Sequence, residues 1–294
     1  MSTTEDMAAA PALSARARFF RFPLVWMLAG LVGVGAVAAL TSDGGMVLPV
    51  VGAVAAVAVY WLVMRFVARR PATELAPARA GWRALFGAAI GVAFIGASML
   101  SVATEFSFTW SGANAWSSVA GTAAVALGAA VTEELMFRGL LLQALERLAG
   151  SWVALAVTAL LFGGAHLANP DATLWGGLAI AIEAGVLLGA AFLWQRSIWF
   201  VAALHFAWNT CVGLIGIAMS GHLQDGLLVA RPTGPDLLTG GSFGIEASIV
   251  PVALSVLISV PMLVAAHRRG HLVPLRRSRR AAAGQSSTAT SPVR

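Results

Sequence analysis

The sequence predicts an all-α membrane protein, a bundle of about eight transmembrane helices with the candidate active site buried between helices four to seven. Three observations lead to this fold class: the composition, eight long apolar runs, and a few polar residues at similar depths within those runs. Of the 294 residues, 59% are hydrophobic and only 11% are charged, whereas a soluble domain carries about 25% charged residues. Because so few polar side chains cannot cover a water-exposed surface, the surrounding solvent is predicted to be a lipid bilayer.

Each crossing of a bilayer needs about 20 apolar residues, and the runs that meet this length follow one another with turn residues between them. The connecting segments include SDGG at 42–45, NPD at 169–171 and a Gly/Pro-rich loop at 220–244. The predicted spans are 23–41, 46–64, 83–103, 117–145, 152–168, 172–194, 197–219 and 245–266.

Three regions are expected. Residues 1–22 form a short cytoplasmic N-terminal tail, and residues 23–266 form the transmembrane domain, with a functional core at about 117–219. Residues 267–294 form a basic cytoplasmic tail that its Ser/Thr/Ala-rich composition predicts to be disordered.

The arginines predict the orientation. They cluster before the first span, between spans two and three, and after spans four, six and eight, and only Arg231 breaks this alternation. Because positive residues are retained on the cytoplasmic side, the chain is predicted to be a multi-pass cell-membrane protein with both termini cytoplasmic. The net charge of +6 is therefore a topology signal, and no nucleic-acid partner is indicated. The single cysteine, Cys211, excludes a disulfide framework.

A small set of strongly polar residues interrupts the apolar spans. A charge at the centre of a membrane helix costs about 2.5–3.5 kcal/mol, so such residues need partners within the protein. At a rise of 1.5 Å per residue, five of them lie between about 12 and 21 Å from the cytoplasmic ends of their helices. These five residues, on four helices, are Glu133, His166, Glu183, His205 and Asn209. Their shared depth predicts a common site.

Two further charges flank Glu133 in the stretch TEELMFRG, residues 132–139. Glu134 and Arg138 are one helical turn apart, so they can form an ion pair that supports the helix. Glu133 is rotated by about 100° from Glu134 and is free to face other helices. Glu183 is expected to act as a supporting hydrogen-bond or gating group, with direct participation in the chemistry as the alternative.

One carboxylate, two histidines and an amide suit the activation of water. A carboxylate in a cavity of low dielectric constant is a good general base, and an imidazole with an Asn amide one turn away can stabilise an oxyanion. Glutamate and histidine are also zinc ligands. Glu133, His166 and His205 could therefore hold Zn²⁺ instead, and the spacing alone leaves both mechanisms open.

The sequence resembles the family of CAAX prenyl protease 2-like and bacteriocin-processing (CPBP) intramembrane proteases. Glu133 to Arg138 matches its E-E-x-x-x-R motif, Phe162 to His166 its F-x-x-x-H motif, and His205 to Asn209 its H-x-x-x-N motif. The resemblance implies that Glu133 is the general base, assisted by His166, and that His205 and Asn209 form the oxyanion pocket. It also implies that Glu134 and Arg138 support the site. The family is commonly labelled metalloprotease, although a metal-free glutamate mechanism has also been argued for it.

The leading hypothesis is thus an intramembrane endopeptidase that cuts a membrane-associated peptide or protein near the cytoplasmic half of the bilayer. The alternative is a non-proteolytic membrane scaffold or bacteriocin-immunity factor that uses the same cavity for binding. A proton-coupled transporter is a third possibility, but the sequence has neither an inverted repeat nor paired broken helices.

Overall fold

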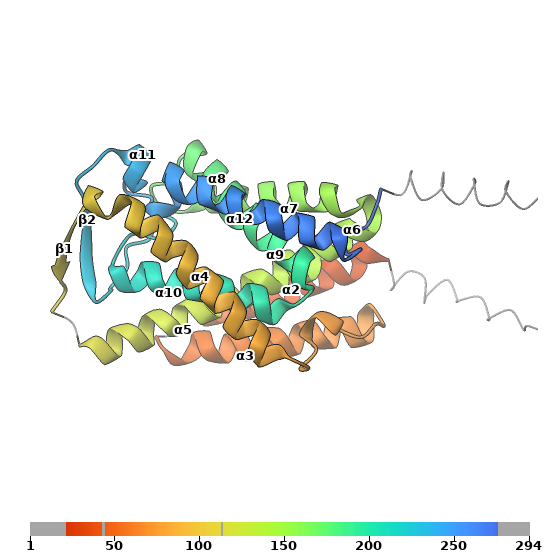
Figure 1. The fold of residues 1–294 in the computed structure, drawn as a ribbon. Coiled ribbons are helices and arrows are strands. Elements are labelled where there is room, and N and C mark those ends of the chain that lie inside the picture. The colour runs from red at the N-terminus through yellow and green to blue at the C-terminus, as the bar shows by residue number, and fades with distance from the viewer. Residues whose placement is uncertain (1–21, 43–44, 113, 276–294) are drawn as a thin grey trace, which may run out of the picture.

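The computed structural model describes residues 22–42, 45–112 and 114–275, and helices run lengthwise through the molecule (Figure 1). The helices are α2 (Pro23–Thr41), α3 (Val47–Leu62), α4 (Ala80–Val102), α5 (Ala115–Glu134), α6 (Gln143–Ala149), α7 (Ser151–Ala165), α8 (Leu174–Ile180), α9 (Leu187–Gln195), α10 (Ile198–Ile215), α11 (Asp236–Thr239) and α12 (Ile249–Arg268). Most of residues 1–22 and of 267–294, which the sequence assigned to the two tails, lie outside the described residues.

Among the described residues, seven helices are long and apolar enough to cross a membrane. They correspond to seven of the eight predicted spans and confirm an all-α, polytopic membrane bundle. The predicted span at 117–145 is not among these seven. It forms a helix nonetheless, in which α5 passes through η4 (Leu135–Leu142) into α6. The count of eight crossings stays a prediction.

The two ends of the bundle differ in their charged residues. Helix α2 begins and α12 ends at the same end of the bundle (Figure 1), which we call the arginine end. It carries Arg65, Arg69, Arg70, Arg79, Arg83, Arg147, Arg196, Arg268 and Arg269. The opposite end, here the ribbon end, includes 103–112, 114–115, 166–173 and 216–248. Its charged groups among the described residues are Glu105, Asp171, Asp225, Arg231, Asp236 and Glu246.

Large apolar side chains on the outer helices are exposed in the isolated chain. Val32 is 73% exposed, Leu40 79% and Leu100 88%. A soluble protein rarely exposes so many large apolar side chains along neighbouring helices, whereas contact with lipid is favourable for them. The outer surface therefore agrees with the membrane location expected from composition.

A two-stranded antiparallel ribbon at the ribbon end was not predicted. Strand β1 (Phe106–Trp110) follows α4, and β2 (Leu228–Pro232) belongs to the long connection after α10; Phe106 pairs with Pro232 and Trp110 with Leu228. The ribbon joins two connections far apart in sequence, and it leaves the helical class unchanged.

Within the described part of the chain, the helices contain three π-helical segments, which the periodicity of the sequence could not reveal. They are η1 (Val63–Val67), η4 (Leu135–Leu142) and η6 (Ala181–Val186). Segments of this kind are frequent at functional sites because they re-aim side chains and free backbone carbonyls. Here η4 begins directly after Glu134, and η6 contains Glu183.

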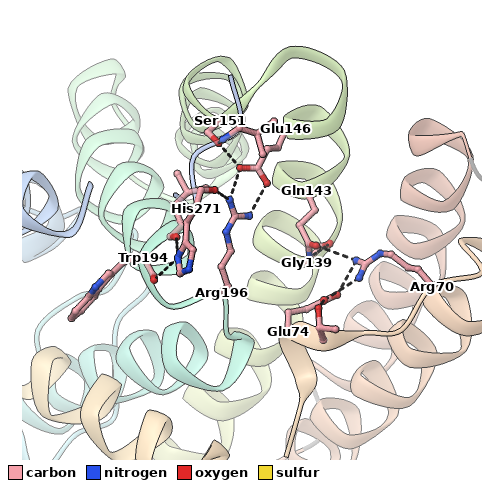
Figure 2. A network of polar contacts seen from close by, with 12 residues as sticks. Arg70, Glu74, Gly139, Gln143, Glu146, Ser151, Trp194, Arg196 and His271 are labelled. Carbon is pink, nitrogen blue, oxygen red and sulfur yellow. Dashed lines mark hydrogen bonds and ion pairs between the residues drawn. The ribbon is translucent and has the colours of Figure 1, made fainter. Parts of the chain in front are cut away.

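At the arginine end, two polar networks tie helices together (Figure 2). In the first, Arg196 forms a double hydrogen bond with Glu146, each at 2.7 Å, and Arg196 also donates to the carbonyl of His271. Ser151 donates to Glu146 and accepts from the Val273 backbone N–H at 2.7 Å. Residues 271–273, which the sequence placed in the C-terminal tail, thus pack against the α6–α7 and α9–α10 connections.

The second network is centred on Glu74, in the connection between η1 and α4. Arg70 donates to both carboxylate oxygens at 2.9 and 3.0 Å, Tyr60 donates to the same group, and Arg70 reaches Gln143 on α6 at 3.1 Å. Burial raises the pKa of Glu74, but the hydrogen bonds and positive charge of Arg70 lower it by more, so the pKa lies below its ordinary value. The network closes the arginine end of the bundle.

We expect Glu74→Gln to lower the free energy of unfolding by about 2–3 kcal/mol at neutral pH, because it leaves the mostly buried Arg70 without its counter-charge. Since the folded-state pKa of Glu74 is depressed, the ionised group stabilises the fold above the ordinary carboxylate pKa of about 4.3. This stability is lost as the pH falls through the folded-state pKa. Denaturant unfolding of the wild type and of the variant in detergent, at several pH values, measures the free energy of unfolding. Glu105→Gln, at a glutamate that forms no ion pair with another described residue, is the control; equal stability of both variants at neutral pH would contradict the expectation.

Candidate active site

A cavity of about 460 Å³ lies among α5, α7, η6 and α10 and extends to the ribbon end. It brings together four of the residues that the sequence analysis selected as catalytic: Glu133, His166, His205 and Asn209. Its walls are mostly apolar, and include Val125, Met136, Phe162, Ile180 and Trp208. A polar site in an apolar cavity is the usual form of a small-molecule or peptide-binding centre.

Behind the cavity, Glu134 links two helices. One of its oxygens, Oε1, accepts from Arg138 Nη1 at 2.8 Å and from His205 Nδ1 at 2.9 Å. Glu134 and Arg138 are 0% and 2% exposed. The geometry matches the predicted pair one turn apart, and it adds a contact that the sequence did not reveal: the pair also holds His205 of α10.

Arg138 finds further partners in the π-helical segment η6. Its Nη2 donates to the carbonyl of Ala184 at 2.7 Å and, more weakly, to that of Gly185 at 3.3 Å. Its guanidinium also lies 4.8 Å from the centre of the Phe162 ring, a favourable cation–π distance. One buried arginine therefore connects η4, η6 and α7 and is surrounded by acceptors, as a charge at membrane depth requires.

His166 is oriented by its own helix. Its Nδ1 lies 2.7 Å from the carbonyl oxygen of Phe162, and because a carbonyl can only accept, Nδ1 carries the proton. In the neutral ring, Nε2 is then an acceptor for a molecule in the cavity. The Phe162 ring packs against His166, with centroids 4.8 Å apart. This double contact gives a physical reason for a phenylalanine four residues before the histidine, a role that the sequence analysis did not assign.

Glu133 and Asn209 line the cavity, and neither side chain forms a hydrogen bond with another described residue. Glu133 Oε2 is 4.0 Å from His205 Nε2, and its side chain is 29% exposed, against 0% for Glu134. Asn209 is one helical turn after His205 and lines the same cavity. Adjacent carboxylates are thus divided between two environments: one is held by an ion pair, and the other is open to a bound molecule.

Glu183 does not take the position expected of a supporting hydrogen-bond group. It is 0% exposed, neither of its carboxylate oxygens bonds to another described residue, and it is not among the residues that line the cavity. Its neighbours Ala184 and Gly185 contribute through their carbonyls instead. Its roles as a supporting, gating or reacting group stay predictions.

Glu246 is a cavity residue that the sequence analysis missed. It lies in a 3-10 turn before α12, is 5% exposed, and its Oε2 accepts from both the backbone N–H and the hydroxyl of Ser220 at 2.6 Å. Burial raises the pKa of Glu246, and the Ser220 hydrogen bonds oppose that shift only in part. The sequence did contain one signal that could have identified Glu246 as a site residue: it is a lone glutamate in the predicted span 245–266.

No three His, Cys, Asp or Glu side chains within residues 22–42, 45–112 and 114–275 are gathered closely enough to hold a metal ion. In the predicted zinc set, Nδ1 of His205 is bonded to Glu134, and Nε2 is 4.0 Å from Glu133. The contact of Nδ1 with Glu134 does not by itself exclude a zinc ligand, because zinc-bound histidines commonly donate to a carboxylate, so Zn²⁺ binding by this set stays a prediction.

The candidate residues lie near the middle of their helices or, for His166, at the ribbon-end terminus of α7. The cavity continues from them to residues 219–224 and 246 at the ribbon end. Cleavage near the cytoplasmic half of the bilayer stays a prediction.

Comparison with known proteins agrees with the motifs. The family model described as "Type II CAAX prenyl endopeptidase Rce1-like" matches residues 114–211, about a third of the chain, and this segment contains all three motifs. The resemblance to the CAAX protease family is thereby confirmed and supports a CAAX-protease-like intramembrane peptidase in general terms. No curated protein and no solved structure matches the chain.

We expect the two adjacent glutamates to differ in their effect on folding. Glu134→Gln leaves the buried Arg138 without its counter-charge and should lower the free energy of unfolding by about 3–5 kcal/mol. Glu133→Gln should change it by less than about 1 kcal/mol, because that side chain is partly exposed and unpaired. Unfolding of the two variants in the same detergent tests this, and equal or reversed effects would contradict the division of roles.

Proposed function

We propose that this protein is an intramembrane endopeptidase that hydrolyses a peptide bond in a membrane-associated protein or peptide. The observation that carries the proposal is the convergence of a carboxylate, two imidazoles and an amide, from three helices, on one mainly apolar cavity. The match of residues 114–211 to a CAAX prenyl endopeptidase model supports the same chemistry.

In the proposed mechanism, Glu133 is the general base. A water molecule between Glu133 and His166 transfers one proton to the carboxylate, while its other O–H donates a hydrogen bond to Nε2 of His166, which the Phe162 carbonyl orients. The water oxygen attacks the carbonyl carbon of the substrate and forms a tetrahedral intermediate. The proton held by Glu133 then passes to the leaving nitrogen as the C–N bond breaks, so the carboxylate is restored.

His205 and Asn209 stabilise the negative oxygen of that intermediate. The Asn209 amide supplies N–H donors directly. His205 Nδ1 donates to the Glu134 carboxylate, which is already paired with Arg138, so Nε2 can donate only when the ring is an imidazolium. Oxyanion stabilisation by His205 therefore requires the doubly protonated ring.

The non-proteolytic alternative, a membrane scaffold or bacteriocin-immunity factor, uses the same cavity for binding alone. It requires the shape of the cavity but not the basicity of Glu133. A substitution that changes the basicity and keeps the shape separates the two functions.

We expect Glu133→Gln to lower the cleavage rate by about 10²–10⁴-fold while unfolding remains like that of the wild type. Cleavage of lipid-anchored fluorogenic peptides by purified protein in proteoliposomes measures the rate. Glu105→Gln, outside the cavity, is the matched control. Full biological activity of Glu133→Gln would overturn the peptidase proposal and favour the scaffold.

Asn209→Ala should lower the turnover number by about 10²–10³-fold, because it removes an oxyanion donor that acts mainly in the transition state. The Michaelis constant should change much less. A loss confined to the Michaelis constant would show that Asn209 binds substrate and does not stabilise the oxyanion.

A further inference from the structure

The cavity connects with only one of the two chemically different ends of the bundle. Asn169, Met219, Ser220, His222 and Gln224 of its lining belong to the ribbon end. Of the described residues that line it, none comes from the arginine-bearing connections at 65–83, 147–150 or 196–197.

Two adjoining cavities extend the site toward the ribbon-end surface. One shares Val125, Ala129, Glu133 and Met136 with the main cavity and continues between α2, α3 and α5. The other shares Val125 and Gln224 and is lined by Met46, hydroxyl groups of α5, Leu223 and Asp225. Leu223 is 91% exposed. Together they form a path from the surface to Glu133, polar at the rim and apolar inside.

The opposite direction is closed by packed side chains. Leu140, Leu142 and Ala144 follow the site along η4 and α6, and each is 0% exposed, as are Leu187 and Leu188 of α9. Beyond them lie the Glu74 and Glu146 networks of Figure 2, which bind the connections of the arginine end to one another. A peptide chain cannot cross this layer without its unpacking.

Arginines mark the cytoplasmic side of a membrane protein. Nine described arginines lie in or next to the connections of the arginine end, whereas the ribbon end has only Arg231 among the residues described, together with five acidic residues. The closed end is thereby assigned to the cytoplasm and the open end to the opposite side.

We propose that the substrate reaches Glu133 from the extracytoplasmic side, and that it is a membrane-anchored protein or peptide whose cleaved segment lies on that side. The class of substrate in this inference rests on the proposed peptidase function. The side of the membrane to which the cavity opens does not depend on that function. A prenylated C-terminal tail, which is made and held in the cytoplasm, would face the closed end and is not the substrate.

The orientation is tested by labelling single cysteines in a bacterial host. Cys211→Ser removes the one native thiol. In that background, Leu223→Cys places a single thiol at the rim of the cavity, and Arg69→Cys places one at the arginine end, where Arg69 is also exposed. A membrane-impermeant maleimide should label Leu223→Cys in intact cells and Arg69→Cys only after permeabilisation. Labelling in the reverse order would overturn the proposal whether or not the protein cleaves peptides.

The substrate side is tested with the native chain in right-side-out and inside-out vesicles, to which lipid-anchored fluorogenic peptides are added. Cleavage should occur at least tenfold faster in right-side-out vesicles, with Glu133→Gln as the inactive control. Faster cleavage in inside-out vesicles would overturn the proposed access side. Absence of cleavage in both vesicle types and in detergent would instead refute the peptidase function, while the cysteine labelling would still decide the orientation.

Discussion

The site depends on one buried interaction, the contact of Glu134 with both Arg138 and His205. Three ionisable side chains at membrane depth are tolerated because they share charge and hydrogen bonds, and because the carbonyls of Ala184 and Gly185 accept hydrogen bonds from Nη2 of Arg138. This cluster joins η4, η6 and α10. It therefore determines where His205 points and leaves the adjacent Glu133 free to act on a bound molecule.

Much of this arrangement could be predicted from the sequence, because the scarcity of charge in apolar spans makes each polar residue informative. The pairing of Glu134 with Arg138 follows from their spacing, and the meeting of Glu133, His166, His205 and Asn209 in one cavity follows from their similar depth. The resemblance to a known family added the roles of these residues but not their contacts.

Other features could not be predicted because they depend on tertiary contacts or on departures from regular helix. The π-helical turns leave no mark in an apolar run, so the carbonyls that hold Arg138 could not be foreseen. Glu246 is brought to the cavity by the connection after α10, and Ser220 binds it from a position 26 residues away. The adjacent glycines Gly163 and Gly164 also differ in a way that the sequence does not reveal, because Gly163 allows α7 to approach α8 closely whereas Gly164 has open space.

The central claim is that a free glutamate activates water while its neighbour is held in an ion pair. The most direct measurement is a single turnover in water labelled with heavy oxygen, followed by mass spectrometry of the product and of the protein segment that contains Glu133. The account predicts one labelled oxygen in the new carboxyl group of the product and none in Glu133. Label in the Glu133 carboxyl group would show a covalent acyl intermediate and would contradict the account.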